Sequence, residues 1–184
     1  MKVLLPLVFI LVASLGTLGQ KSNDSINKQI KSLKADKTIT LTFDGASSKV
    51  MARASNFSDA DAKAAGIQAM NFGMAYFYPG QQLAASPETI NFTFWVLSKK
   101  PRFGPAGKWD AVLPSDTLSL GEYRYVAKPA ENMEYLNFKI ARSDLAKIAA
   151  SPTPVKFQLG SYPFTFTPEQ MDLLRAYVAV SETK

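Results

Sequence analysis

The chain of 184 residues carries 21 lysines and arginines against 15 aspartates and glutamates, a formal net charge of +6, and contains neither histidine nor cysteine. Without these two residue types there is no ready proton shuttle near neutral pH, no thiolate, no disulfide, and no histidine or cysteine ligand for a metal. A lipoprotein anchor, which is built on a cysteine thiol, is excluded as well, and we expect neither a metal nor a cofactor.

Residues 1–19 have the pattern of a secretory signal peptide. Lys2 gives a positive start, residues 3–13 are apolar, and the small residues Gly16 and Gly19 suit a signal peptidase. An uncleaved membrane anchor is the alternative, but the apolar run is shorter than the ~20 residues that a transmembrane helix needs. We therefore expect a periplasmic or secreted protein with no transmembrane segment after cleavage. Roughly 165 residues would remain, which can build a core without disulfides.

Residues 20–37 form a basic N-terminal arm. This arm could contact an anionic membrane or polymer, but a solvated extension behind the signal peptide is the simpler interpretation. A short helix is predicted within the arm, because Ile26, Ile30 and Leu33 would share one face of it. Asp24 or Ser25 could cap this helix. The lysines of the arm are Lys21, Lys28, Lys31, Lys34 and Lys37.

The β-rich domain is expected to begin after the arm with a hairpin and a short helix. Alternating apolar and polar residues predict a strand over 39–43, and the turn signal Asp44-Gly45 leads to a returning strand over 49–54. Residues 58–65 predict a helix with Ser58 as its N-cap. A calcium loop is the alternative for the aspartates of this helix, but the other ligands of such a loop are missing.

Two long strands are predicted next. The strand over 70–78 has a large aromatic face, and on its other face Gly73 could let a second backbone or a ligand come close. The strand over 90–97 is apolar on both faces, which predicts a central strand buried on both sides.

Residues 99–110 are predicted to form a long loop, because two prolines and two glycines exclude regular structure. Basic side chains alternate there with aromatic ones, and such groups can hold sugars, carboxylates or lipid headgroups. The alternative is a connecting loop with solvated charges and with rings that fold back onto the core. The candidate binding residues of this loop are Lys99, Lys100, Arg102, Phe103, Lys108 and Trp109.

The strand that follows contains a change of parity. Leu118 and Leu120 occupy even positions, whereas Tyr123 and Tyr125 occupy odd ones. A β-bulge at Gly121 would keep all four side chains on one face of the sheet.

A strand over 133–141 and a helix over 143–149 are predicted next. The strand directs Leu136, Phe138 and Ile140 inward, while its intervening residues face outward. Ser143 is the expected cap of the helix, which the following prolines end.

The last third of the chain reads as a hairpin followed by a capped helix. Gly160-Ser161 suits a two-residue turn that pairs residues 155–159 with 162–166. Pro163 lacks an N–H group, which predicts that the second of these strands lies at a sheet edge. Thr167 opens a capping box, so a helix over 168–180 is expected to follow.

Residues 133–180 resemble the ends of many exported bacterial proteins of unknown function, which share a short helix, a glycine-centred hairpin and a Thr/Ser-x-Glu-Gln helix. The resemblance implies a bacterial envelope setting and transfers no functional residue. Together the elements predict an α+β fold, mainly antiparallel β: a single domain over 38–184 with about seven or eight strands. It would be a β-sandwich or partly closed barrel with short helices and a C-terminal capping helix.

For function, the residue types favour a non-enzymatic protein and indicate no catalytic residue. Ser143-Asp144-Leu145-Ala146 has alanine where a Ser-x-x-Lys pair needs lysine. A carboxylate-based hydrolase stays open, because paired acidic residues could form in three dimensions.

Two non-enzymatic hypotheses compete. The first is a protein-interaction or structural module of the envelope, which uses the edge strand at 162–166 or a sheet face. The second is a carrier of a small apolar or anionic ligand in a barrel-like cavity. Nucleic acid is not expected as a partner of an exported chain without clustered arginines. The cavity of the carrier would be lined by Phe72, Tyr76, Phe92, Phe94 and Tyr123.

Overall fold

The computed structural model describes residues 20–54 and 56–183, which form an α+β fold of antiparallel sheets. The larger sheet has six strands, in the order β2 (Ile39–Phe43), β3 (Ser47–Arg53), β4 (Ala69–Pro79), β6 (Thr89–Leu97), β10 (Met133–Ala141) and β9 (Arg124–Lys128). The second sheet has four, in the order β12 (Tyr162–Thr165), β11 (Lys156–Leu159), β7 (Lys108–Val112) and β8 (Thr117–Glu122). A two-stranded pair joins β1 (Lys21–Ser22) to β5 (Gln82–Leu83). The helices are α1 (Asn23–Ser32), α2 (Asp59–Ala64), α3 (Arg142–Ala149) and α4 (Pro168–Ser181), with a 3-10 turn, η1, at Pro129–Glu131.

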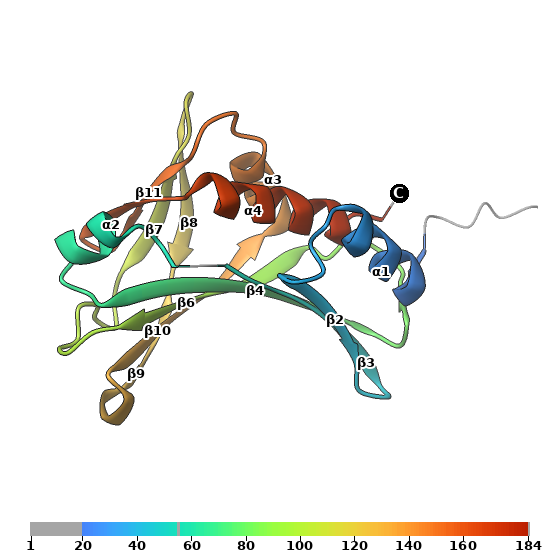
Figure 1. The fold of residues 1–184 in the computed structure, drawn as a ribbon, viewed down its shortest axis with the longest axis horizontal. Helices are drawn as coiled ribbons and strands as arrows, with labels where there is room; N and C mark the ends of the chain where they lie inside the picture. Colours follow the sequence, from blue (N-terminus) through green and yellow to red (C-terminus); the bar gives the residue numbers. More distant parts are fainter. Residues whose placement is uncertain (1–19, 55, 184) are drawn as a thin grey trace, which may run out of the picture.

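All four helices and the four-stranded sheet lie on one side of the six-stranded sheet (Figure 1). Aromatic rings join the two sheets: Phe94 stacks on Phe157 with ring centroids 5.7 Å apart, and Trp109 lies 4.6 Å from Phe92. Further along the same face, α4 sets Tyr177 against Tyr76 at 5.7 Å. The six-stranded sheet is open, with β2 and β9 as its edges, so the arrangement is sandwich-like and not a closed barrel. In the described part of the chain, no helix combines the length and apolarity needed to span a membrane.

The predictions for the C-terminal third are confirmed. Leu159 pairs with Tyr162 across the turn, Gly160 has a positive φ of 58°, and β12 lies at a sheet edge. The Thr167 hydroxyl accepts from the N–H of Gln170, whose side chain in turn accepts from the Thr167 N–H, which completes the capping box of α4. Here local turn and cap chemistry agrees with the tertiary packing.

The predictions at Gly121 and Ser58 are also confirmed, whereas the cap predicted at Ser143 is wrong. The pairing of β8 with β7 gains one residue between Ser119 and Glu122, and Gly121 has a φ of 91°, as a bulge at this glycine requires. Ser58 accepts from the N–H of Asp61 as the N-cap of α2. Helix α3, by contrast, begins directly after β10 with Ala141 at its N-cap and no side-chain cap, so Ser143 is not the cap.

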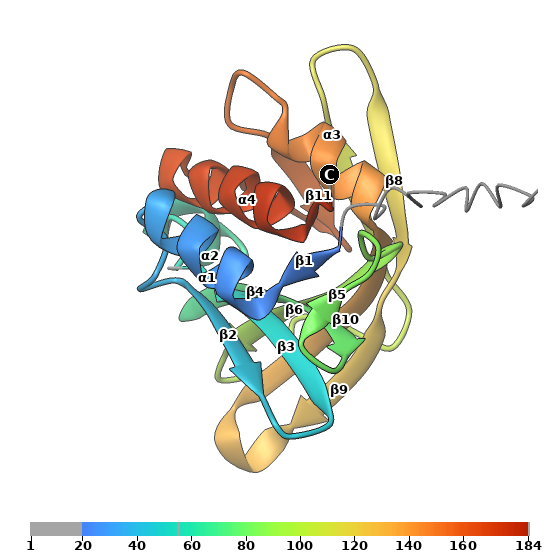
Figure 2. The ribbon, with the colours of Figure 1, turned by 90° about the vertical axis from the view of Figure 1, so that its right-hand side faces the viewer.

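The basic N-terminal arm is part of the folded domain from Lys21 onward, which corrects both the solvated-extension interpretation and the expected domain start at residue 38. Ile26 and Ile30 on α1 are buried (0% and 2% exposed), and α1 lies beside α4 (Figure 2). The N-cap of α1 is Ser22, and not Asp24 or Ser25. The proposed signal peptide, 1–19, lies outside the described residues.

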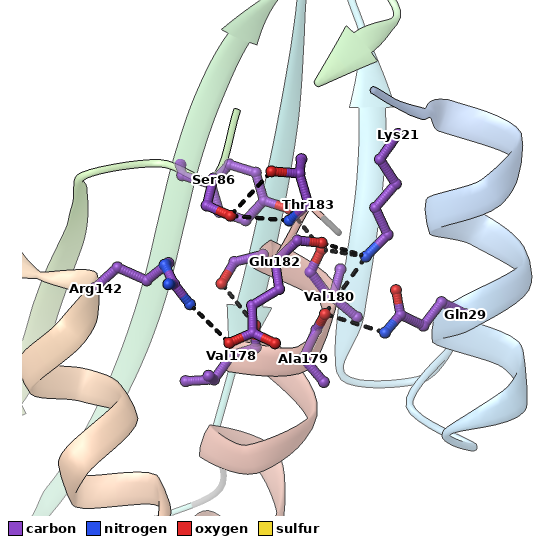
Figure 3. A network of polar contacts seen from close by, with 11 residues as sticks. Lys21, Gln29, Ser86, Arg142, Val178, Ala179, Val180, Glu182 and Thr183 are labelled. Atoms are coloured by element: carbon purple, nitrogen blue, oxygen red, sulfur yellow. Dashed lines mark hydrogen bonds and ion pairs between the residues drawn. The ribbon is translucent and has the colours of Figure 1, made fainter. Parts of the chain in front are cut away.

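Lys21 holds this segment to the end of α4 (Figure 3). Its ammonium group donates to the carbonyls of Val180 at 3.0 Å and Glu182 at 2.9 Å, with a longer contact of 3.4 Å to Ala179. Gln29 on α1 donates to the same Ala179 carbonyl at 3.0 Å. A cation at the carbonyl end of a helix satisfies acceptors that have no partner within the helix.

Replacing Lys21 with methionine is therefore expected to lower the free energy of unfolding by about 1–2 kcal/mol, because the carbonyls at the end of α4 lose their charged donor. Urea denaturation of both proteins measures this difference. Lys28→Met is the matched control, since Lys28 is exposed on α1, and it should change stability by less than ~0.5 kcal/mol. Equal effects of the two substitutions would contradict the role given to Lys21.

Candidate functional site

The six candidate residues from the segment 99–110 do not converge on one pocket. Trp109 belongs to β7, is 0% exposed and packs among core rings, while Phe103 is 7% exposed and packs against Tyr123 and Tyr162. The guanidinium of Arg102 donates to the Gly66 carbonyl at 2.9 Å. The remaining three, Lys99, Lys100 and Lys108, are exposed. The rings therefore fold back onto the core, as the alternative interpretation of this loop expected.

Glu134 holds the start of this loop in place. Its carboxylate is buried and accepts four hydrogen bonds: from the backbone N–H groups of Arg102 and Phe103, both at 2.9 Å, from the Tyr125 hydroxyl at 3.0 Å, and from the Ser98 hydroxyl at 3.1 Å. Burial, together with the hydrogen bond to this carboxylate, raises the pKa of Tyr125 to about 12. Glu134 is not among the residues predicted to be functional, although its even position on β10, in phase with the inward-facing Leu136, indicates a buried acid.

The aromatic residues expected to line a carrier cavity contact one another instead. Phe72 stacks on Phe92 with centroids 4.9 Å apart, and Phe92 lies 5.0 Å from Phe94. Tyr76 contacts Tyr177 of α4, as described above, and Tyr123 contacts Phe138 at 5.6 Å. These five side chains are 5% exposed or less, so their rings are part of the filled core between the layers.

The edge strand β12 is closed to an added strand. In the register of β12 with β11, the backbone N–H and C=O positions of residues 163 and 165 point away from β11, toward the free edge. Pro163 has no N–H group, and the N–H of Thr165 donates to the Asp61 carboxylate of α2 at 3.0 Å. Since β-augmentation needs free N–H groups along the edge, this strand is a poor docking element.

The remaining candidate is the face of the six-stranded sheet that turns away from the helices, which we call the open face (Figure 1). Along each long strand, buried residues alternate with half-buried or exposed ones, and the latter form this face, together with Gly73, which is buried under the Trp95 ring. The open face consists of Lys49, Met51, Asn71, Gly73, Ala75, Phe77, Asn91, Thr93, Trp95, Arg124, Val126, Lys128, Tyr135, Asn137 and Lys139.

An apolar row crosses the open face from β6 to β9. Trp95 pairs with Tyr135, and Tyr135 pairs with Val126, so the three side chains are direct cross-strand neighbours. Trp95 is half-buried and Val126 is 38% exposed. The prediction that the 90–97 strand is buried on both faces is therefore wrong for the face that carries Trp95, because nothing in the described chain is layered over it.

Polar and basic residues occupy the neighbouring rows. Thr93 pairs with Asn137, which pairs with Arg124, while Asn91 pairs with Lys139. These five residues line a surface hollow of about 780 Å³ at the point where the chain leaves β8 for β9. Glu122 contributes a carboxylate to the same lining. No outward position of the six strands, all of which are described, carries an acidic residue.

Comparison with known protein families, with curated proteins and with solved structures finds no match for this chain. Within residues 20–54 and 56–183, acidic side chains form no cluster of three or more that could hold a metal ion.

Proposed function

We propose that this protein is an exported, non-enzymatic interaction module of the cell envelope that binds its partner through the open face. The observation that supports this most is a sheet face left uncovered, with Trp95, Tyr135 and Val126 in one row and cations in the neighbouring rows. Aromatic residues on an exposed sheet with a polar rim are typical of binding surfaces. Export is supported by the leader pattern of residues 1–19 and by the resemblance of residues 133–180 to exported bacterial proteins.

The other routes to binding have less support. The edge strand is blocked at Pro163 and Thr165, the loop of Phe103 is tied to Glu134, and the rings proposed for a carrier pack against one another. For catalysis, Ser25 and Lys28 have the Ser-x-x-Lys spacing, but both are exposed on α1. The open face combines exposed aromatic area with charge, and for this reason it is the surface we favour.

Hydroxyl-radical footprinting of the protein, free and mixed with cell envelopes of its host, tests the proposal. Oxidation of Trp95 and Tyr135 should fall at least five-fold when envelopes are added, because a bound partner would exclude solvent from both rings. Tyr162, which is half-buried on the four-stranded sheet, is the internal control and should keep its rate. Unchanged oxidation of Trp95 and Tyr135 would overturn the proposal.

A further inference from the structure

The six-membered ring of Trp95 packs against the β4 backbone at Gly73. A Cβ built on Gly73 would overlap Cη2 of this indole and would lie only 2.8 Å from Cζ3. Glycine at position 73 therefore provides the space on which the six-membered ring rests. Because Trp95 is half-buried, part of the indole also contacts solvent, and it forms an apolar patch beside the polar rows.

Each of the other two large rings of the open face has a lysine ammonium over it. The Lys49 ammonium lies 5.5 Å from the centroid of the Phe77 ring, and the Lys128 ammonium lies 5.5 Å from that of Tyr135. Lys128 also pairs with Glu131 at 3.2 Å. In the described part of the chain, Trp95 has no lysine ammonium over its ring. Phe77, which is 56% exposed, lies six positions along β4 from Asn71, the residue that pairs with Trp95, so Phe77 is not a neighbour of the indole.

Hydrogen-bonding groups beside this apolar patch are held in fixed positions. The Thr93 hydroxyl donates to the Asn137 side-chain oxygen at 2.9 Å, and the Asn137 amide donates to the Arg124 carbonyl at 3.2 Å. Outward residues that follow each other along a strand are about 7 Å apart, so this row lies one step from Trp95. Asn91 and Lys139 lie one step further, around the hollow described above.

From this combination we infer that the partner on the open face is an anionic polysaccharide; the inference rests on the function proposed above. The apolar C–H face of a sugar ring stacks on one flat indole, its hydroxyl groups bond to amides and hydroxyls, and its carboxylates or sulfates pair with Arg124 and Lys139. The outward positions of the six-stranded sheet carry no acidic residue, and Glu122 is the one carboxylate that lines the hollow, which favours a polyanion. Single-stranded nucleic acid fits less well, because it uses successive neighbouring aromatic platforms, and Phe77 lies six positions along β4 from the residue that pairs with Trp95.

Binding of defined polymers by isothermal titration calorimetry tests this inference. The folded protein should bind polygalacturonate or chondroitin sulfate, with an affinity that falls as the salt concentration rises. It should not bind neutral dextran. Trp95→Ala, and separately the pair Arg124→Ala with Lys139→Ala, should each reduce affinity at least ten-fold. The matched control is the pair Lys63→Ala with Lys156→Ala, which removes two exposed cations outside the open face. The affinity of this double variant should stay within two-fold of that of the original protein. Because Arg124 and Lys139 are exposed, the double variant should stay folded. It therefore tests the inference even if Trp95→Ala unfolds the protein.

Three results would overturn the inference: no binding of either anionic polysaccharide, equal binding of dextran, or tighter binding of a thymidine oligonucleotide of the same charge. The footprinting result separates this failure from failure of the proposed function. If envelopes protect Trp95 and Tyr135 but the polysaccharides do not bind, the open face is an interface for another partner, and only the polysaccharide assignment falls. If envelopes leave both rings exposed, the proposed function itself fails.

Discussion

Replacing Glu134 with alanine is expected to lower the free energy of unfolding by about 3–5 kcal/mol, the largest effect of any substitution considered for this protein. The carboxylate is 2% exposed and satisfies two backbone N–H groups, at Arg102 and Phe103, and two hydroxyl groups. Alanine would remove the acceptor of both N–H groups and of the Tyr125 hydroxyl, whereas the Ser98 hydroxyl keeps the Lys100 carbonyl at 2.8 Å. It would also leave a cavity under the loop. Urea denaturation measures the loss of stability.

Two further measurements locate this effect at the loop. Amide hydrogen exchange at Arg102 and Phe103 should accelerate in the alanine variant, whereas amides of the β11–β12 hairpin should keep their order of protection. Glu134→Gln keeps the shape and one acceptor oxygen but turns an NH₂ group toward donors, so we expect an intermediate loss of stability. A Glu134→Ala protein within ~1 kcal/mol of the original would show that the carboxylate does not hold the loop.

Replacing Gly73 with alanine is expected to cost about 2–3 kcal/mol, because the added Cβ overlaps the Trp95 ring. In an ordinary strand position the same change would stabilise by about 0.5–1 kcal/mol, so the sign of the effect is itself diagnostic. The indole must lift from the sheet, and its fluorescence should shift to the red, while the second tryptophan, Trp109, stays buried in the core. Thermal denaturation and emission spectra measure both effects.

A double-mutant cycle with Trp95→Ala identifies the cause of the Gly73→Ala effect. Once the ring is removed, the nearest remaining atom to the new Cβ is the Ala52 carbonyl oxygen at 3.1 Å, which a small shift accommodates. Gly73→Ala should therefore cost less than ~0.5 kcal/mol in the Trp95→Ala background. If the cost is the same in both backgrounds, the ring does not rest on this glycine.

The elements that could be predicted from the sequence are those specified by local chemistry. The hairpin around Gly160, the capping box at Thr167 and the bulge at Gly121 each depend on residues within a few positions of one another, and tertiary packing agrees with all three. Strand alternation also predicted which residues of β10 face outward, among them Tyr135, which lies on the open face. The larger two sheets contain ten strands, and the sequence suggested seven or eight, because β7 was not predicted and the single strand expected around Gly121 divides into β8 and β9.

The candidate site could not be predicted in the same way, because it depends on contacts between distant segments. Trp109 reads as a loop residue until its pairing with Leu159 on β11 places it in the core. Trp95 reads as buried, since no local pattern shows that the helices gather on the opposite face of the sheet. The sequence indicates that Gly73 leaves space for a close neighbour. Only the cross-strand register shows that this neighbour is the indole of Trp95.

The contact between Lys21 and the last turn of α4 has a consequence for how the chain matures. Residues 21 and 182 are 161 positions apart, so a ribosome releases them far apart in time. Helix α1 packs against β2 and α4, so its packing is complete only after α4 has emerged. A nascent chain that stays incomplete for so long remains loosely structured, which suits passage through a membrane channel and agrees with the proposed export.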